Sequence, residues 1–217
     1  QMAMKGYLKR QFHMPHIPMP SRPSLNLSLG PDIDSQLDTV ARAIEGASQP
    51  VLVVGSQSVV NMLPAEADEL AAQIEKLGIP VFLGGSARGL MGRRSPIQFR
   101  HHRGKALREA DVVIVAGFPF DFRMGYGRKI NQKATLISVN LDPVALKKNR
   151  RPTIAVEQHP GRFVAQLAGR VGSTPDWTDW TATLQEREDA RDAEIAAKAR
   201  TGGPLVDPVH LFMRIEE

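Results

Sequence analysis

The stretch that decides the fold is Ala110–Arg128, which reads ADVVIVAGFPFDFRMGYGR. It contains the uninterrupted apolar run Val112–Ala116, and a strand that is apolar on both faces is covered by helices on both sides. Gly117 ends the run, at a point where the backbone can turn or let a ligand approach closely. Asp121 and Arg123 follow on a loop, and ligands of open α/β sheets bind beyond the carboxyl ends of the strands. The stretch therefore predicts a central buried strand followed by a loop at a binding edge.

Similar apolar runs recur before and after this strand and alternate with helical patterns. The predicted strands are Val51–Val54, Ile79–Leu83, Val112–Ala116, Ala134–Val139 and Thr153–Val156. The predicted helices cover residues 33–44, 63–77, 105–110, 144–148 and 160–169. This alternation predicts the α/β class: a three-layer α/β/α fold with a doubly wound parallel sheet of five or six strands, Rossmann-like, with right-handed crossovers.

Three segments are expected along the chain. Residues 1–32 are interrupted by prolines and predict a linker from a preceding domain. Residues 33–171 form the central Rossmann-like domain. Residues 172–217 are interpreted as a helical connector into a C-terminal domain that is missing from this chain.

The connector combines an apolar face with a charged run. Trp177, Trp180 and Leu184 share one face of a predicted helix, which continues into the charged residues Glu186–Lys198. We expect this run to be a solvated helix packed through its first turns only. A further helix is predicted to begin at Pro208.

Composition limits the classes of function. Hydrophobic residues make up 42% and charged residues 24% of the 217 residues, ordinary values for a soluble protein. No stretch approaches a membrane-spanning length, and no signal peptide is evident, so no membrane partner is expected. The absence of cysteine excludes disulfides and thiolate metal sites and fits a cytoplasmic location. A net charge of +5 permits phosphate-bearing ligands without indicating nucleic acid, and no nucleic-acid partner is expected.

Glycines follow several of the predicted strands. Gly55, the Gly84-Gly85 pair and Gly117 would leave a groove with exposed backbone N–H groups suited to a pyrophosphate. The arginines between residues 88 and 103 could add charge-assisted contacts to it. No complete G-x-G-x-x-G follows a strand, so tight-turn glycines beside a solvated basic loop are the alternative interpretation.

Other polar residues could have either a structural or a ligand-binding role. Asp121 and Arg123 could form a loop salt bridge or contact a ligand at the sheet edge. Asn140 could meet a ribose or belong to a turn. His101 and His102 are adjacent and point in different directions, which is a poor arrangement for a metal, and no metal ligand is predicted. No catalytic residues are predicted, because no acid–base or nucleophile constellation is present.

Three segments carry a resemblance: GGSARGL at Gly84–Leu90, DVVIVAGFPFDFR at Asp111–Arg123 and LISVNLD at Leu136–Asp142. With them, the chain resembles the central domain of thiamine diphosphate-dependent enzymes, particularly acetolactate synthase-like proteins and 2-hydroxyacyl-CoA lyases. The resemblance implies a three-domain parent, a homodimer or homotetramer, with thiamine diphosphate and Mg held between its outer domains. It also implies that this chain alone neither binds thiamine diphosphate nor catalyses a reaction.

In that family the middle domain holds FAD in acetolactate synthases, and an adenine nucleotide or CoA in acyl-CoA relatives. The resemblance places contacts of this kind on Gly55, Ser56, Gln57, Leu83, Gly84, Gly117, Asp121, Arg123 and Asn140. The chain departs from FAD-binding members at Pro119, where they have an arginine, and at Asn140, where they have an acid. These departures favour ADP, CoA or an empty groove over FAD.

The resulting interpretation is a non-catalytic central domain of a thiamine diphosphate-dependent lyase or carboligase, structural and able to bind a nucleotide. The alternative is a free-standing nucleotide-binding module with a sirtuin-like or flavoprotein-like fold. Binding measurements with FAD, ADP and CoA distinguish the ligands.

Overall fold

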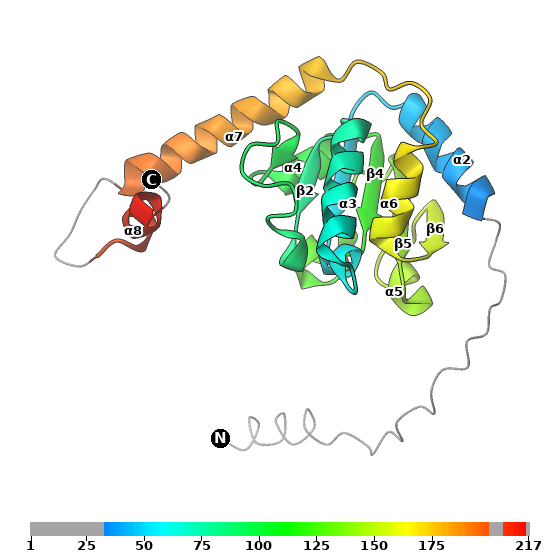
Figure 1. The fold of residues 1–217 in the computed structure, drawn as a ribbon. Helices are drawn as coiled ribbons and strands as arrows, with labels where there is room; N and C mark the ends of the chain where they lie inside the picture. Colours follow the sequence, from blue (N-terminus) through cyan, green and yellow to red (C-terminus); the bar gives the residue numbers. More distant parts are fainter. Residues whose placement is uncertain (1–32, 200–205, 216–217) are drawn as a thin grey trace, which may run out of the picture. The chain divides into compact units, whose positions relative to one another are not determined.

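The computed structural model describes residues 33–199 and 206–215. Six parallel strands form one sheet in the order β3-β2-β1-β4-β5-β6 (Figure 1). The strands are β1 Pro50–Val54, β2 Val81–Leu83, β3 Gln98–Phe99, β4 Val112–Ala116, β5 Thr135–Asn140 and β6 Ile154–Glu157. The predicted doubly wound α/β fold is confirmed. The predicted linker at residues 1–32 lies outside the described residues.

The centre of the sheet is the pair β1 and β4. Their register runs from Pro50 opposite Val112 to Val54 opposite Ala116, and every residue of both strands is buried. Branched apolar side chains on both faces of these strands need cover on both faces, because apolar surface is stabilised by removal from water. The strand order changes direction between β1 and β4, and right-handed crossovers on either side of this point supply helices to both faces.

The helices are α2 Ile33–Glu45, α3 Pro64–Leu77, α4 Arg103–Glu109, α5 Pro143–Lys147, α6 Pro160–Ala168, α7 Thr178–Ala199 and α8 Pro208–Ile215. Short 3₁₀ turns follow three strands: η1 Ser56–Val59, η2 Gly85–Ala87 and η3 Phe122–Gly127. In Figure 1, α3 and α6 lie side by side on the near face of the sheet. The β1-to-β2 connection, which contains α3, moves toward the β3 edge of the sheet, whereas the β3-to-β4 and β5-to-β6 connections move toward the β6 edge. Right-handed crossovers therefore place α4 and α5 on the face opposite α3.

The strand β3 lies inside the segment that the sequence predicted as a basic loop. Gln98 pairs with Val81 and Phe99 with Phe82, extending the sheet by one short edge strand. Two residues are too few to show an alternation of apolar and polar side chains, so the pattern carried no strand signal here. The ring of Phe99 lies against that of Phe82, with 6.0 Å between centroids, and both are buried.

The helix α7 packs more deeply than its charged sequence suggested. The shared face of Trp177, Trp180 and Leu184 is confirmed, and both indole N–H groups donate to backbone carbonyls, at 2.9 Å to Ala47 and 3.0 Å to Pro50. The expectation that only the first turns pack is wrong. Glu188, three turns into the helix, is 5% exposed, because its carboxylate binds backbone N–H groups of the body.

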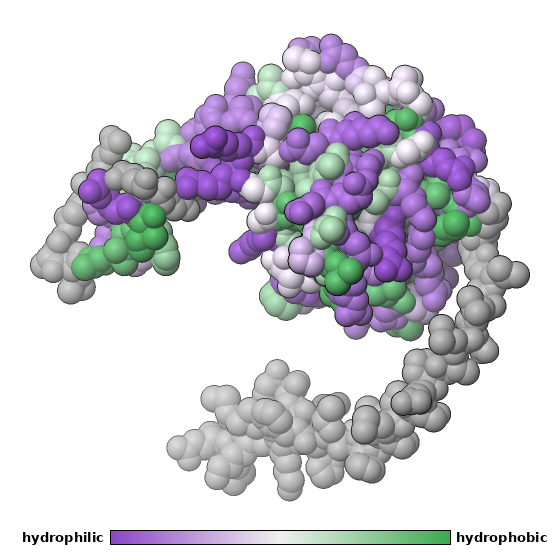
Figure 2. All heavy atoms as spheres, viewed as in Figure 1, coloured by the Kyte–Doolittle hydropathy of each residue, from purple (hydrophilic) through white to green (hydrophobic). Residues whose placement is uncertain are grey.

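Exposed apolar side chains on the body of the domain gather at one end. Between residues 33 and 199, the exposed large hydrophobic residues all follow β1, β4 or β5, in loops, in η3 or in the first turn of α5: Val60, Leu63, Phe122, Tyr126, Leu141 and Val144. Figure 2 shows a mostly hydrophilic face with hydrophobic atoms where α3 begins and near α5. In residues 33–199 and 206–215, no helix combines the length and apolarity that crossing a bilayer would require.

Candidate anion-binding pocket

The three glycines after β1, β2 and β4 use their backbone N–H groups within the sheet. Gly55 donates to Ala116 at 2.8 Å, Gly84 to Val54 at 2.9 Å and Gly117 to Val139 at 2.9 Å. For these three N–H groups the prediction of exposed donors is wrong, whereas nucleotide binding at this edge stays a prediction. Each N–H group continues the parallel ladder one residue beyond its strand, so it is not available to a ligand.

The same glycines let neighbouring loops pack directly on one another. A Cβ added to Gly55 would overlap the carbonyl of Gly117, and one added to Gly84 would overlap the ring of Phe118. Gly117 also has a φ of +69°, and a Cβ there would lie 2.8 Å from the backbone nitrogen of Ser58. The crevice between β1 and β4 is therefore filled by protein atoms.

Polar side chains around this crevice join one loop to another. The Ser56 hydroxyl accepts from the backbone N–H of Ser86 at 3.0 Å, and the Gln57 side-chain oxygen accepts from that of Leu141 at 3.2 Å. Asn140 is buried, and its side-chain oxygen accepts from the N–H of Asp142 at 2.9 Å, the turn that was one of its two readings. The cofactor-binding roles assigned to these residues stay predictions.

Asp121 and Arg123 form a bidentate ion pair. Arg123 Nη2 lies 2.6 Å from Asp121 Oδ2, and the backbone N–H of Arg123 donates to Asp121 Oδ1 at 2.9 Å. Hydrogen bonds from the Arg123 side chain hold the pKa of the Asp121 carboxyl below its ordinary value, and the pKa of Arg123 is raised in return. Of the two readings of this pair, the structure shows the loop salt bridge.

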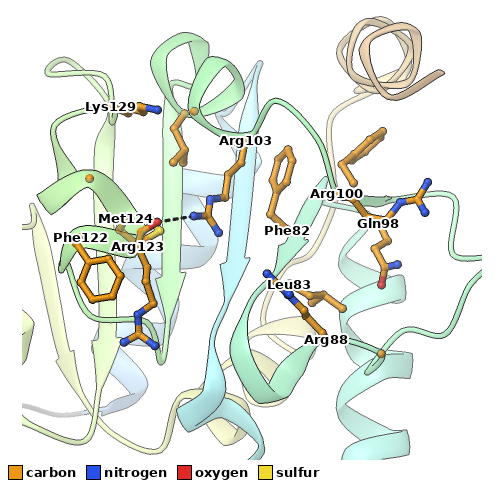
Figure 3. Close-up of a pocket in the computed structure, with 15 residues that line it drawn as sticks. Phe82, Leu83, Arg88, Gln98, Arg100, Arg103, Phe122, Arg123, Met124 and Lys129 are labelled. Carbon is orange, nitrogen blue, oxygen red and sulfur yellow. Dashed lines mark hydrogen bonds between the residues drawn. The ribbon is translucent and has the colours of Figure 1, made fainter. Parts of the chain in front are cut away.

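An open pocket of about 630 Å³ lies beside the closed crevice, over the ends of β2 and β3 and between α4 and η3 (Figure 3). Five cationic side chains line it: Arg88, Arg100, Arg103, Arg123 and Lys129. None of the described residues on its wall is acidic. Arg123 is already paired with Asp121, and Arg100 with Glu188 and Asp192, so the attraction of this wall for an anion comes mainly from the other cations.

Only part of this pocket matches the predicted site. Leu83 and Arg123 line it, and the predicted basic loop supplies Arg88, Arg100 and Arg103. The sequence analysis missed Phe122 and Lys129 as pocket residues. Both lie in the segment between β4 and β5, so their position after the central strand was the one available signal.

The pocket is open because little covers this part of the sheet. The helix α4 has only seven residues, and η3 replaces a full helix after β4. Gly104 makes further room, since a Cβ there would lie 2.7 Å from Cδ of Lys129. The stem of Lys129 therefore crosses α4 closely and brings its ammonium group to the pocket.

Arg103 is the most informative cation. Its guanidinium donates to the carbonyl of Arg123 at 2.8 Å and lies 5.5 Å from the centroid of the Phe118 ring. Burial lowers the pKa of Arg103, and the neighbouring charge of Arg88 lowers it further. In the described part of the chain, neither Arg88 nor Arg103 forms an ion pair with a carboxylate. A partly buried cation facing another cation is costly, and an anion between them would relieve that cost.

Arg100 connects the pocket to α7. The Glu188 carboxylate accepts from the backbone N–H groups of Arg100 and His101 and from Arg100 Nε at 2.9 Å. Asp192 accepts from Arg100 Nη2 at 2.6 Å and lies 3.0 Å from His101 Nε2. His101, Glu188 and Asp192 are close enough to share an ion, but each already binds a partner here. The cluster is an ion-pair clamp between α7 and the end of β3.

A doubly wound α/β domain with a basic pocket at the carboxyl edge of its sheet is the class that the fold and the site define. Within that class, the chain belongs to the family described as "Thiamine pyrophosphate enzyme, central domain", whose model matches residues 37–167. The resemblance stated from the sequence is thereby confirmed.

Curated relatives agree with the family. The chain is 34% identical over 224 residues to 2-hydroxyacyl-CoA lyase 2 of Homo sapiens, covering 99% of the chain and 34% of the relative. It is 35% identical over 190 residues to 2-hydroxyacyl-CoA lyase 2 of Danio rerio, covering 85% and 30%. It is 34% identical over 182 residues to the acetolactate synthase large subunit IlvG of Mycobacterium tuberculosis, covering 82% and 32%. The chain thus spans about a third of the length of these relatives, and the free-standing module is not favoured.

Proposed function

We propose that this central domain binds the phosphate groups of a nucleotide-type ligand, ADP or the ADP portion of CoA, in its basic pocket. The observation that carries the proposal is Arg103, partly buried and lining the same pocket as Arg88, with no carboxylate on the pocket wall among the described residues. Charge-assisted hydrogen bonds from guanidinium groups to phosphate are strong and geometrically specific. A diphosphate would satisfy both cations at once.

The size of the pocket and the names of the relatives support this ligand class. A volume of about 630 Å³ lies in the range usual for small-molecule sites and exceeds what inorganic phosphate needs. Several relatives are named as lyases of 2-hydroxyacyl-CoA, and CoA carries a diphosphate and an adenosine. FAD is the weaker candidate, because Pro119 and Asn140 stand where FAD-binding members have an arginine and an acid.

The described residues of this chain offer no free set of carboxylates for the magnesium ion that accompanies thiamine diphosphate. Among residues 33–199 and 206–215, the group of acids and histidines able to share an ion is His101, Glu188 and Asp192, and its carboxylates are bound by Arg100 and His101. We therefore assign thiamine diphosphate and Mg to other domains of a longer parent, a lyase or carboligase. In that parent, a homodimer or homotetramer, this domain would have no catalytic residue of its own.

Isothermal titration calorimetry tests the proposal. We expect ADP and CoA to bind the 217-residue chain, and Arg103→Met to weaken both by tenfold or more, because a charged hydrogen-bond donor to phosphate is lost. Lys76→Ala is the control, since Lys76 is an exposed cation in the last turn of α3 and does not line the pocket. No heat with either ligand, or equal affinity in Arg103→Met, would refute the proposal.

A further inference from the structure

Phe122 is unusually exposed for its position on the pocket wall. Phe122 is 74% exposed, and no large hydrophobic residue between residues 33 and 199 is more exposed. It lines the same pocket as Arg88 and Arg103, the two cations assigned to phosphate. An aromatic face left in water next to a phosphate site is chemically suited to a ligand that carries both a phosphate and a flat ring.

The local structure holds this ring in place. Asp121 caps η3 by accepting from the N–H of Arg123, and its carboxylate also fixes the Arg123 guanidinium. That guanidinium lies 5.9 Å from the centroid of Phe122 and 5.4 Å from that of Phe118. Figure 3 shows Phe122 and Arg123 side by side at the start of the same turn. A cation therefore supports the ring while most of its surface remains open.

We infer that Phe122 stacks on the nucleobase of the ligand whose phosphates bind Arg88 and Arg103. The inference rests on the proposed function and adds the residue that distinguishes a nucleotide from a simple diphosphate. Every base has a flat π face, and stacking on an aromatic side chain is worth about tenfold or more in affinity per base. The pocket, at about 630 Å³, has room for a base as well as a diphosphate.

The test compares two ligands that share a diphosphate and differ in the base. ADP and inorganic pyrophosphate are titrated into the wild-type chain, Phe122→Ala and Phe122→Trp. We expect Phe122→Ala to weaken ADP about tenfold and leave pyrophosphate unchanged, and Phe122→Trp to retain ADP binding. Leu63→Ala is the matched control: Leu63 is 68% exposed, at the same end of the domain, and not part of the pocket wall.

The outcomes separate this inference from the proposed function. Unchanged ADP affinity in Phe122→Ala overturns the stacking role and leaves Phe122 to a protein contact. An equal loss for pyrophosphate also overturns it, because the substitution would then act through the cations. Pyrophosphate binding without any gain for ADP refutes stacking while the anion pocket stands. Failure of both ligands to bind the wild type refutes the proposed function and the inference together.

Discussion

Beyond β1 and β4 the loops interlock through Gly55 and Gly117, whereas beyond β2 and β3 the same edge of the sheet opens into a basic pocket. In the first region, small residues let backbones meet and every glycine N–H is used within the sheet. In the second, a seven-residue helix and a 3₁₀ turn leave space, and arginines line it. A glycine at the end of a strand can therefore make room either for a ligand or for a neighbouring loop. Which of the two occupies the space depends on how the neighbouring loops pack.

The largest expected effect concerns the closed region. Gly55→Ala forces a Cβ into the carbonyl of Gly117, and we expect a loss of about 3 kcal/mol in the free energy of unfolding, the upper end of overpacking. Gly46→Ala is the control, because the nearest atom to its new Cβ would be 3.6 Å away. Denaturant unfolding measures both. Equal stability of the two variants would show that this crevice is loosely packed.

The second effect lies at the rim of the open region. Glu188→Ala removes the acceptor of two backbone N–H groups and of the Arg100 side chain, and we expect a loss of about 2 kcal/mol. The exposed Glu186→Ala should change stability by less than about 0.5 kcal/mol. Urea denaturation followed by tryptophan fluorescence reports on this clamp, because Trp177 and Trp180 lie on α7 or directly before it. Unchanged stability of Glu188→Ala would show that the clamp is dispensable and that the other contacts of α7, including the packing of Trp180 and Leu184, hold the helix.

The third effect is the response to anions. A ligand that binds only the folded state stabilises it by about 1.4 kcal/mol at ten times its dissociation constant. We expect inorganic phosphate to raise the melting temperature of the wild-type chain, and to do so less in Arg103→Met, when sodium chloride matches the ionic strength. An equal rise in both proteins would place the anion away from Arg103 and Arg88.

The smallest effect is the pH dependence of the Asp121–Arg123 pair. The pKa of Asp121 is lowered in the folded state, so the pair stabilises the fold above the unfolded pKa of about 4 and loses this contribution as the pH falls through the lowered value. Because both side chains are partly exposed, the contribution is about a few tenths of a kcal/mol. In Asp121→Asn, the free energy of unfolding should fall by this amount less than in the wild type when the pH is lowered from 5 to about 3. A slope equal to that of the wild type would assign the acid sensitivity to other carboxylates.

Several elements were predictable because their signals are local. The run Val112–Ala116 predicted a strand covered on both faces, and the helical pattern of residues 63–77 predicted α3. By contrast, β3 is a strand only because Val81 and Phe82 lie beside it, and Glu188 is buried only because β3 ends beneath α7. Glu188 looks like any other charged residue of its run, because its partner His101 is 87 residues away in the sequence.

The site divides in the same way. Arg88, Arg100, Arg103 and Arg123 could be proposed for anion contacts from composition and order along the chain, because parallel strands bring their following loops to one edge. The residue types and their order were therefore sufficient for the fold class, for the family and for the general place of a binding edge. Which part of that edge is open was decided in three dimensions. Backbone packing at Gly55 and Gly117 closes one half of the edge. The other half stays open because α4 is too short to cover it, and the arginines and Phe122 line the resulting pocket.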